Sequence, residues 1–129
     1  PDWQALEPNI MLPSAGQGAL AVQCRADDAT LIAQLAVLDD VGTRACVTAE
    51  RCFLAGLDGS CRTPIAALAI PDPENAHTAL LHGRLLAEDG TEFVENTCRF
   101  DPADLDAAGA AGAQLAAELR RRAPHLVTA

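Results

Sequence analysis

Aromatic residues are scarce in this sequence: there is no tyrosine, one tryptophan and three phenylalanines among 129 residues. Half of the residues are nevertheless hydrophobic, which is enough to form a core. That core must consist of Leu, Val, Ile and Ala, with alanine dominating the helices. The chain length suits one compact domain, or one domain together with a piece of another.

Positive charge is also limited, because 9 Lys and Arg residues oppose 18 Asp and Glu residues and the formal net charge is −9. This balance excludes a surface that follows nucleic-acid phosphates, and we expect no nucleic-acid partner. The one basic run, residues 120–122, falls near the end of a predicted helix. Cations there interact favourably with the helix dipole, so we interpret the run as a solvated helix end.

Long apolar runs are absent too, since charged residues or prolines interrupt each hydrophobic stretch. The sequence therefore predicts neither a signal peptide nor a membrane span, and a cytoplasmic location is the expectation. The chain begins with Pro1 rather than Met, and its first residues carry no clear start signal for a domain. We expect it to be a fragment of a longer protein.

Five cysteines, an odd number without a secretory context, indicate free thiols rather than disulfides. Their separations of 22, 6, 9 and 37 residues do not match the paired spacing of zinc sites. The three histidines form no usable cluster, and we predict no metal site. Cysteines 24, 46 and 52 are interpreted as small buried hydrophobes.

The first third of the chain contains a flexible turn at residues 14–18, followed by an apolar run at 19–24 that predicts a short buried strand. Asp27 and Asp28 precede apolar residues at helical spacing, which predicts a short helix ending near Asp39.

From about residue 40 the pattern predicts an α+β domain of order α-β-β-β-α, with a three-stranded antiparallel sheet and helices on one face. Asp40 is the expected cap of a helix reaching Leu57. The strands are expected at 64–70, 78–87 and 91–100, the last two joined by a hairpin at Asp89 and Gly90. The inward stripe of the first helix is predicted to be Val41, Ala45, Ala49, Cys52, Phe53 and Leu57.

The last helix is expected to start at Asp101 and Pro102, an N-cap followed by proline at the first helical position. Gly109 and Gly112 weaken this helix, or let it lie close on the sheet.

Cys61 lies on a Gly- and Ser-containing loop between the first helix and the first strand of this domain. Such a loop presents a thiol rather than packing it, so the cysteine is available for a covalent attachment. A Cys-His hydrolase would need a base beside it, and His82 is the best candidate, although it reads equally as a satisfied, half-buried imidazole. Gln17 and Gly18 suggest a hinge more than a phosphate cradle, because the rest of a nucleotide-loop pattern is missing.

Three passages, residues 12–25, 48–54 and 57–66, together resemble the C-terminal part of porphobilinogen deaminase, also called hydroxymethylbilane synthase. The resemblance covers most of the chain. It is strong to about residue 69, and afterwards only the element order and the hairpin match.

In this three-domain family, the resemblance implies that residues 1–16 end the second domain and that residues 17–38 return to the first as a strand and a helix. Residues 40–129 would form the third domain, in which the matching Cys61 holds a dipyrromethane cofactor through a thioether. Gln17 and Gly18 lie at the domain junction and are expected to act as a hinge first and to contact the cofactor second.

The implied activity is condensation of four porphobilinogen molecules into hydroxymethylbilane, with release of ammonia, in tetrapyrrole and heme biosynthesis. In this family the catalytic aspartate and the cations that bind substrate carboxylates belong to the first two domains. We therefore expect no catalytic residue in this chain, inactivity without the missing N-terminal domains, and a monomeric full enzyme. The negative net charge agrees with a basic cleft elsewhere.

Two departures from the family pattern flank the cysteine: Ser60 replaces a Gly or Ala, and Arg62 replaces an amide side chain. Arg62 either meets a cofactor carboxylate or is solvated. Two other classes of function stay open, a non-catalytic binding module that has kept the fold and a thiol-dependent hydrolase or redox protein. The fragment interpretation also predicts that residues 19–24 are mobile, pack on the third domain or pair with another chain.

Overall fold

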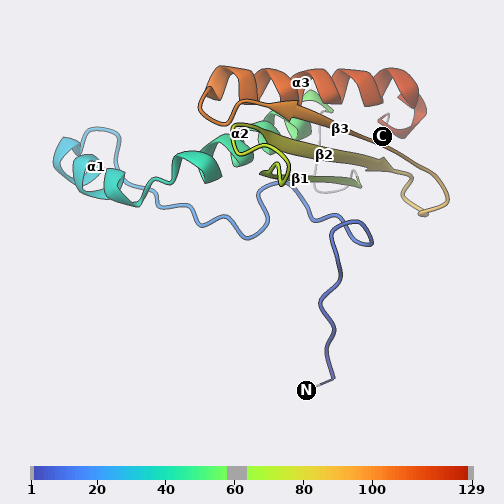
Figure 1. The fold of residues 1–129 in the computed structure, drawn as a ribbon, viewed down its shortest axis with the longest axis horizontal. Coiled ribbons are helices and arrows are strands. Elements are labelled where there is room, and N and C mark those ends of the chain that lie inside the picture. The colour runs from blue at the N-terminus through green and yellow to red at the C-terminus, as the bar shows by residue number, and fades with distance from the viewer. Residues whose placement is uncertain (1, 58–63, 128–129) are drawn as a thin grey trace.

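A computed structural model describes residues 2–57 and 64–127 of the chain. Its elements follow one another in the order shown in Figure 1. They are α1 (Ala29–Leu35), a 3₁₀ turn (Ala36–Leu38), α2 (Val41–Gly56), β1 (Ile65–Pro71), β2 (Ala79–Leu86), β3 (Phe93–Phe100), α3 (Leu105–Arg122) and a second 3₁₀ turn (Pro124–Leu126). The predicted α+β class and the order α-β-β-β-α are confirmed.

The three strands form one antiparallel sheet in the order β1-β2-β3. Helices α2 and α3 lie together on one face of it (Figure 1). The predicted hairpin joins β2 to β3, and Gly90 takes a positive φ of 72° in its turn. A left-handed backbone favours glycine there because a Cβ atom would be strained.

The core lies between the sheet and the two helices. Every second residue of β2 is buried, from Ala79 to Leu85, and these residues face the helices. Gly83 belongs to this face, and a Cβ atom at its position would lie 2.6 Å from the ring of Phe53. The largest fully buried side chains are Phe53, Leu57, Leu81, Leu85, Leu115 and Leu119. The sequence expectation of a mainly aliphatic core is confirmed, and Phe53 and Phe100 are the phenylalanines buried in it.

Helix α3 contacts α2 closely at Gly112, where a Cβ atom would lie 2.2 Å from the carbonyl oxygen of Ala49. The glycine therefore allows the approach of two helices, not the approach of a helix to the sheet that the sequence suggested. At Gly109 the nearest atom to such a Cβ is the Cys52 sulfur at 3.5 Å, which is an ordinary contact.

The helix starts test the capping predictions. Asp40 and Asp28 cap α2 and α1, since their side chains accept hydrogen bonds from the backbone N–H of Thr43 and Leu31. The predicted start of α3 at Asp101 is wrong, because Asp104 is the cap and accepts from the N–H of Asp106 and Ala107. Asp101 instead accepts from the N–H of Ala103 in the preceding turn. A second capping aspartate three residues later thus displaces the first.

The inward face of α2 also differs from the prediction at its ends. Ala45, Ala49, Phe53 and Leu57 are fully buried, as expected. Val41 is 51% exposed, because the first turn of the helix extends past the sheet, and Cys52 is half-buried. Glu50 is buried in the stripe instead.

Residues 9–16 lie along the free edge of β1. The N–H of Ala67 donates to the carbonyl of Pro13 at 2.9 Å, and Leu12 is buried. The guanidinium of Arg84 reaches the carbonyl of Asn9 at 3.5 Å. This segment covers part of an edge that would otherwise present unpaired backbone groups.

Residues 17–38, called the arm below, are largely exposed, and Figure 1 shows α1 standing clear of the sheet. The predicted strand at 19–24 does not form, because no neighbouring strand is present to pair with it. Leu20 is 98% exposed, and α1 contains no buried residue. Among the described residues, no helix combines the length and apolarity needed to cross a membrane.

Candidate functional site

Cys61, the principal site residue of the sequence analysis, lies outside the described residues, as do Ser60 and Arg62. The two flanks of residues 58–63 are described. Leu57 is fully buried after the end of α2, and the carbonyl of Pro64 accepts a hydrogen bond from the N–H of Leu86 at 3.0 Å. The six residues between them therefore connect two fixed points of the core.

Gln17 and Gly18 belong to a tight turn at residues 14–19. The N–H of Gln17 donates to the carbonyl of Ser14, and the N–H of Ala19 donates to that of Gly16. Gly16 and Gly18 have φ values of 73° and 83°, so both need the conformational freedom of glycine. The Ser14 hydroxyl donates to the Gln17 side-chain oxygen at 3.0 Å. These bonds define a specific turn, and a hinge role for Gln17 and Gly18 stays a prediction.

Glu50, which the sequence analysis did not single out, ties this turn to the domain. One carboxylate oxygen accepts from the N–H of Gly16 at 2.6 Å, and the other accepts from the N–H of Ala69 at 2.7 Å. The residue is only 5% exposed. Buried carboxylates are costly unless they are hydrogen-bonded, and here both oxygens have a donor.

A signal for Glu50 existed in the sequence. Cys46, Phe53 and Leu57 lie four residues before it and three and seven residues after it, which places all four on one side of a helix. An acidic residue within such a stripe indicates a buried carboxylate with specific partners.

A pocket of about 470 Å³ lies between the turn, the first half of α2 and the end of β1. Its walls include Gln17 and Gly18, together with Cys46, Glu50 and Ala69. Among the described residues that line it, the charged ones are Asp40 and Glu50, and none is a cation. A second pocket of about 300 Å³ lies between residues 19–22 and the region where α2 begins.

The larger pocket does not fit the carboxylate groups of a dipyrromethane, because two carboxylates and no cation line it. Direct contact of Gln17 and Gly18 with the cofactor therefore stays a prediction.

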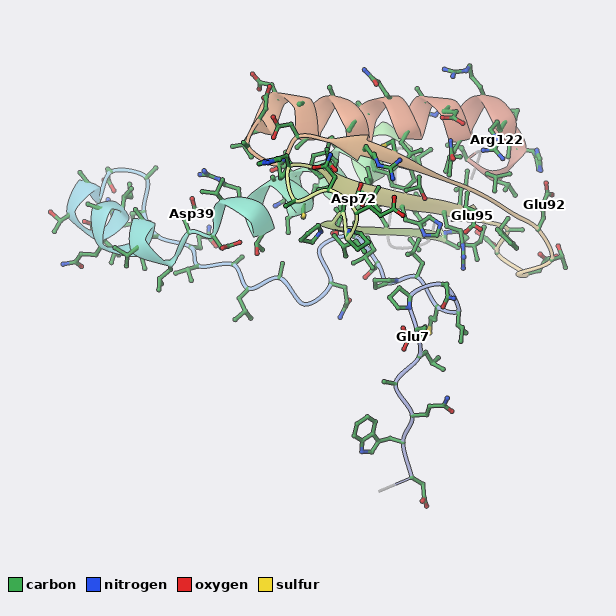
Figure 2. The ribbon with its side chains drawn as sticks, viewed as in Figure 1. Glu7, Asp39, Asp72, Glu92, Glu95 and Arg122 are labelled. Carbon is green, nitrogen blue, oxygen red and sulfur yellow. The ribbon has the colours of Figure 1, made fainter. Side chains whose placement is uncertain are left out.

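His82, the candidate base for a thiol hydrolase, is engaged on the open face of the sheet. Its Nε2 lies 3.0 Å from Glu95, which also accepts from Arg84 at 2.7 Å. The Arg84 guanidinium, and after it His82, holds the pKa of the Glu95 carboxyl below its ordinary value. Figure 2 shows Glu95 toward the same end of the molecule as Arg122, the last residue of α3. His82 is therefore a half-buried imidazole that is hydrogen-bonded to Glu95.

The described cysteines show no sign of activation. Cys24, Cys46, Cys52 and Cys98 are free thiols and are half-buried. The first three of them are therefore less buried than the sequence predicted. Burial raises the pKa of the Cys46 and Cys98 thiols, which disfavours the reactive thiolate. Within residues 2–57 and 64–127, no group of three or more His, Cys, Asp or Glu side chains is placed to hold a metal ion.

Comparison with known proteins gives two family matches in chain order. Residues 2–33 match the model described as porphobilinogen deaminase, dipyromethane cofactor binding domain. Residues 44–121 match the one described as porphobilinogen deaminase, C-terminal domain.

Curated relatives carry the same name. A porphobilinogen deaminase of Paracoccus denitrificans is 48% identical over 121 residues, which cover 93% of this chain and 36% of the relative. Porphobilinogen deaminase 1 of Streptomyces coelicolor is 46% identical over 117 residues, 88% of this chain and 37% of the relative. For the Nocardia farcinica porphobilinogen deaminase the identity is 44% over 122 residues. The chain thus spans about a third of the length of the relatives it matches.

Proposed function

Because the chain belongs to the porphobilinogen deaminase family, we propose that it is the cofactor-carrying C-terminal part of a porphobilinogen deaminase. The whole protein would condense four porphobilinogen molecules into hydroxymethylbilane and release ammonia, in tetrapyrrole biosynthesis in the cytoplasm. The observation that carries this proposal is the pair of family matches at residues 2–33 and 44–121, in that order on one chain.

We assign residues 1–16 to the end of the second domain, 17–38 to the return segment of the first, and 40–129 to the third. The exposed arm supports this division, since its apolar side chains have no partner strand among the described residues. The two-thirds of the relatives' length that this chain does not span would supply that partner.

Cys61 is the proposed anchor of the dipyrromethane. When bound, this group supplies the pyrrole end to which substrate units are added. The residues of this chain contribute the attachment: the buried Leu57 and the hydrogen-bonded Pro64 fix both ends of the segment that contains the thiol. A tether between two fixed points holds one end of a growing chain and leaves the other end free to reach a separate catalytic centre.

The substrate-binding cations and the catalytic aspartate are assigned to the part of the protein that precedes this chain. Porphobilinogen carries carboxylates, which arginine and lysine bind best. This chain has a net charge of −9, and its larger pocket has no cation among the described lining residues. The 129-residue chain is therefore expected to be inactive alone, and the complete enzyme is expected to be a monomer.

The test is intact-mass analysis of the protein expressed from the complete reading frame that contains this chain. The mass is expected to include a dipyrromethane adduct that Cys61→Ser removes. Cys52→Ser is the matched control and keeps the adduct, because its half-buried sulfur lies in the contact of α2 with α3. An unmodified mass in an active enzyme would overturn the anchor role of Cys61.

The same reading frame separates this proposal from the alternative of a non-catalytic binding module. A frame with an upstream part as long as in the relatives supports the enzyme. A frame that begins close to Pro1 supports the module, because the catalytic domains would then never be made with it. Rapid alkylation of Cys61 in protein without the adduct would instead favour a thiol-dependent activity.

A further inference from the structure

Glu50 is a buried side chain that joins three separate parts of the described chain. It belongs to α2, and its two oxygens accept from Gly16 in the turn and from Ala69 in β1. The partners lie 34 residues before it and 19 residues after it. A helix, an edge strand and a domain junction therefore meet at one carboxylate.

The position of Ala69 explains why a carboxylate is needed. Ala69 is two residues beyond Ala67, and both N–H groups point away from β2 toward the free edge of β1. Pro13 supplies the acceptor for Ala67, and Glu50 supplies the acceptor for Ala69. The turn then continues from Pro13 to Gly16, whose N–H occupies the second oxygen. Segment 13–16 is thus fixed to the domain at both of its ends.

We propose that Glu50 is a positioning residue, which fixes the turn of Gly16 against α2 and β1 and so sets the position of the C-terminal domain relative to the segments on either side of the turn. This inference rests on the function proposed above, in which those segments belong to the substrate-binding domains. The helix that carries Glu50 ends at Gly56, directly before the residues that contain Cys61. The turn is thus tied to the helix that precedes the proposed attachment residue.

The N–H groups of Gly16 and Ala69 each need an acceptor oxygen, and the carboxylate of Glu50 provides one for each. In Glu50→Gln one oxygen remains, and the amide nitrogen faces an N–H donor, so one of the two bonds is lost. Glu50→Asp keeps both oxygens but is one methylene shorter, so it reaches one partner at most. The matched control is Glu118→Gln on α3, a half-buried carboxylate bonded to Asn96 at 2.8 Å and remote from the turn.

The first measurement is amide hydrogen exchange in the 129-residue chain. In the unaltered chain, the Gly16 and Ala69 amides are expected to exchange much more slowly than that of Leu20 in the arm. Glu50→Gln is expected to speed exchange at Gly16 or Ala69 by roughly tenfold, the loss of one charge-assisted bond, and to leave Leu81 in β2 unchanged. Glu118→Gln is expected to change neither. Exchange at Gly16 as fast as at Leu20 in the unaltered chain would overturn the proposal without any variant.

The second measurement is steady-state kinetics of the protein from the complete reading frame. Glu50→Gln and Glu50→Asp are expected to lower kcat roughly 10- to 100-fold with KM changed less than about twofold, since misplacement affects the reaction more than substrate binding. The dipyrromethane adduct is expected to stay, and Glu118→Gln is expected to have normal kinetics.

The two proposals fail in different ways. A loosened Gly16 with unchanged kcat would overturn the positioning role and leave the enzyme assignment intact. Absence of the adduct and of activity in the unaltered full protein would overturn the enzyme assignment, while the exchange measurement would still decide whether Glu50 holds the turn.

Discussion

The arm at residues 17–38 and the domain at residues 41–127 differ in how far their apolar side chains are exposed. In the domain, Phe53 and Leu115 are buried to 2% exposure or less between two helices and a sheet. In the arm, Leu20 and Val37 are 98% and 83% exposed. Two acidic residues labelled in Figure 2 differ in the same way, since the Asp39 side chain, directly after the arm, is 40% exposed and the Asp72 side chain, directly after β1, is 1% exposed. The sequence thus contains apolar residues of two kinds, those that are buried within the domain and those that stay exposed in the arm.

The largest expected effect that tests this contrast comes from Phe53→Ala. The ring is fully buried and packs over Gly83, so its removal leaves a cavity in the centre of the core. We expect a loss of about 3–5 kcal/mol in the free energy of unfolding, which is much of the stability of a small domain. Urea denaturation followed by circular dichroism measures it.

The matched change in the arm is Leu20→Ala, which is expected to alter the free energy of unfolding by less than about 0.5 kcal/mol. If both substitutions destabilised the chain equally, the arm would be part of the core after all, and the contrast between the two regions would be lost.

Gly112→Ala tests the close contact of α2 with α3. A new Cβ atom would clash with the carbonyl of Ala49 and the N–H of Phe53. Both belong to the backbone, so no side-chain rotation can relieve the clash. We expect a destabilisation of about 1–3 kcal/mol from overpacking, measured by the urea midpoint. Gly109→Ala is the control, because its Cβ finds normal space. That variant is expected to be up to about 1 kcal/mol more stable, since alanine favours a helix.

The two helix caps give a smaller effect. Asp40→Ala removes the acceptor of the Thr43 N–H at the start of α2, and about 1 kcal/mol of global stability is expected to go with it. Asp28→Ala removes the equivalent acceptor at the start of α1. Because α1 buries nothing, this second change is expected to lower helix content without moving the urea midpoint. Equal shifts of the midpoint would show that the two helices unfold together.

The smallest expected effect is a dependence of stability on pH. Arg99 donates to the carboxylate of Asp72 at 2.8 Å and holds its pKa below the ordinary value. A lowered folded-state pKa adds stability above the unfolded-state pKa, and that stability is lost as the pH falls from about 5 toward 3. Asp72→Asn is expected to lower the urea midpoint at pH 7 and to differ less from the unaltered chain at pH 3.

Asp27 provides the comparison in the arm. Its pKa is also lowered, by Arg25, but the pair is exposed and the partners are two residues apart. Asp27→Asn is therefore expected to leave the midpoint unchanged at both pH values. An effect of Asp27 as large as that of Asp72 would contradict the view that only the domain contributes to global stability.

Much of the domain could be predicted because its signals are local. The Asp40 cap, the Gly90 hairpin and the alternation of β2 each depend on residues close together in the chain. The start of α3 was misplaced because Asp101 and Asp104 are both capping residues, and only the geometry of the preceding turn decides between them. The strand at 19–24 was predicted from its apolar run, but a strand exists only beside another one.

The sequence alone determined the family, the α+β class, the caps of α1 and α2 and the position of Cys61 in the connection between α2 and β1. These follow from short motifs and from periodicity, which are written into neighbouring residues. The tertiary structure decided that Gly112 faces a helix, that the arm stays uncovered and that Glu50 is the side chain that holds the Gly16 turn. Those outcomes depend on N–H groups and backbone atoms brought together from distant parts of the chain, as when Gly16 and Ala69 meet at one carboxylate.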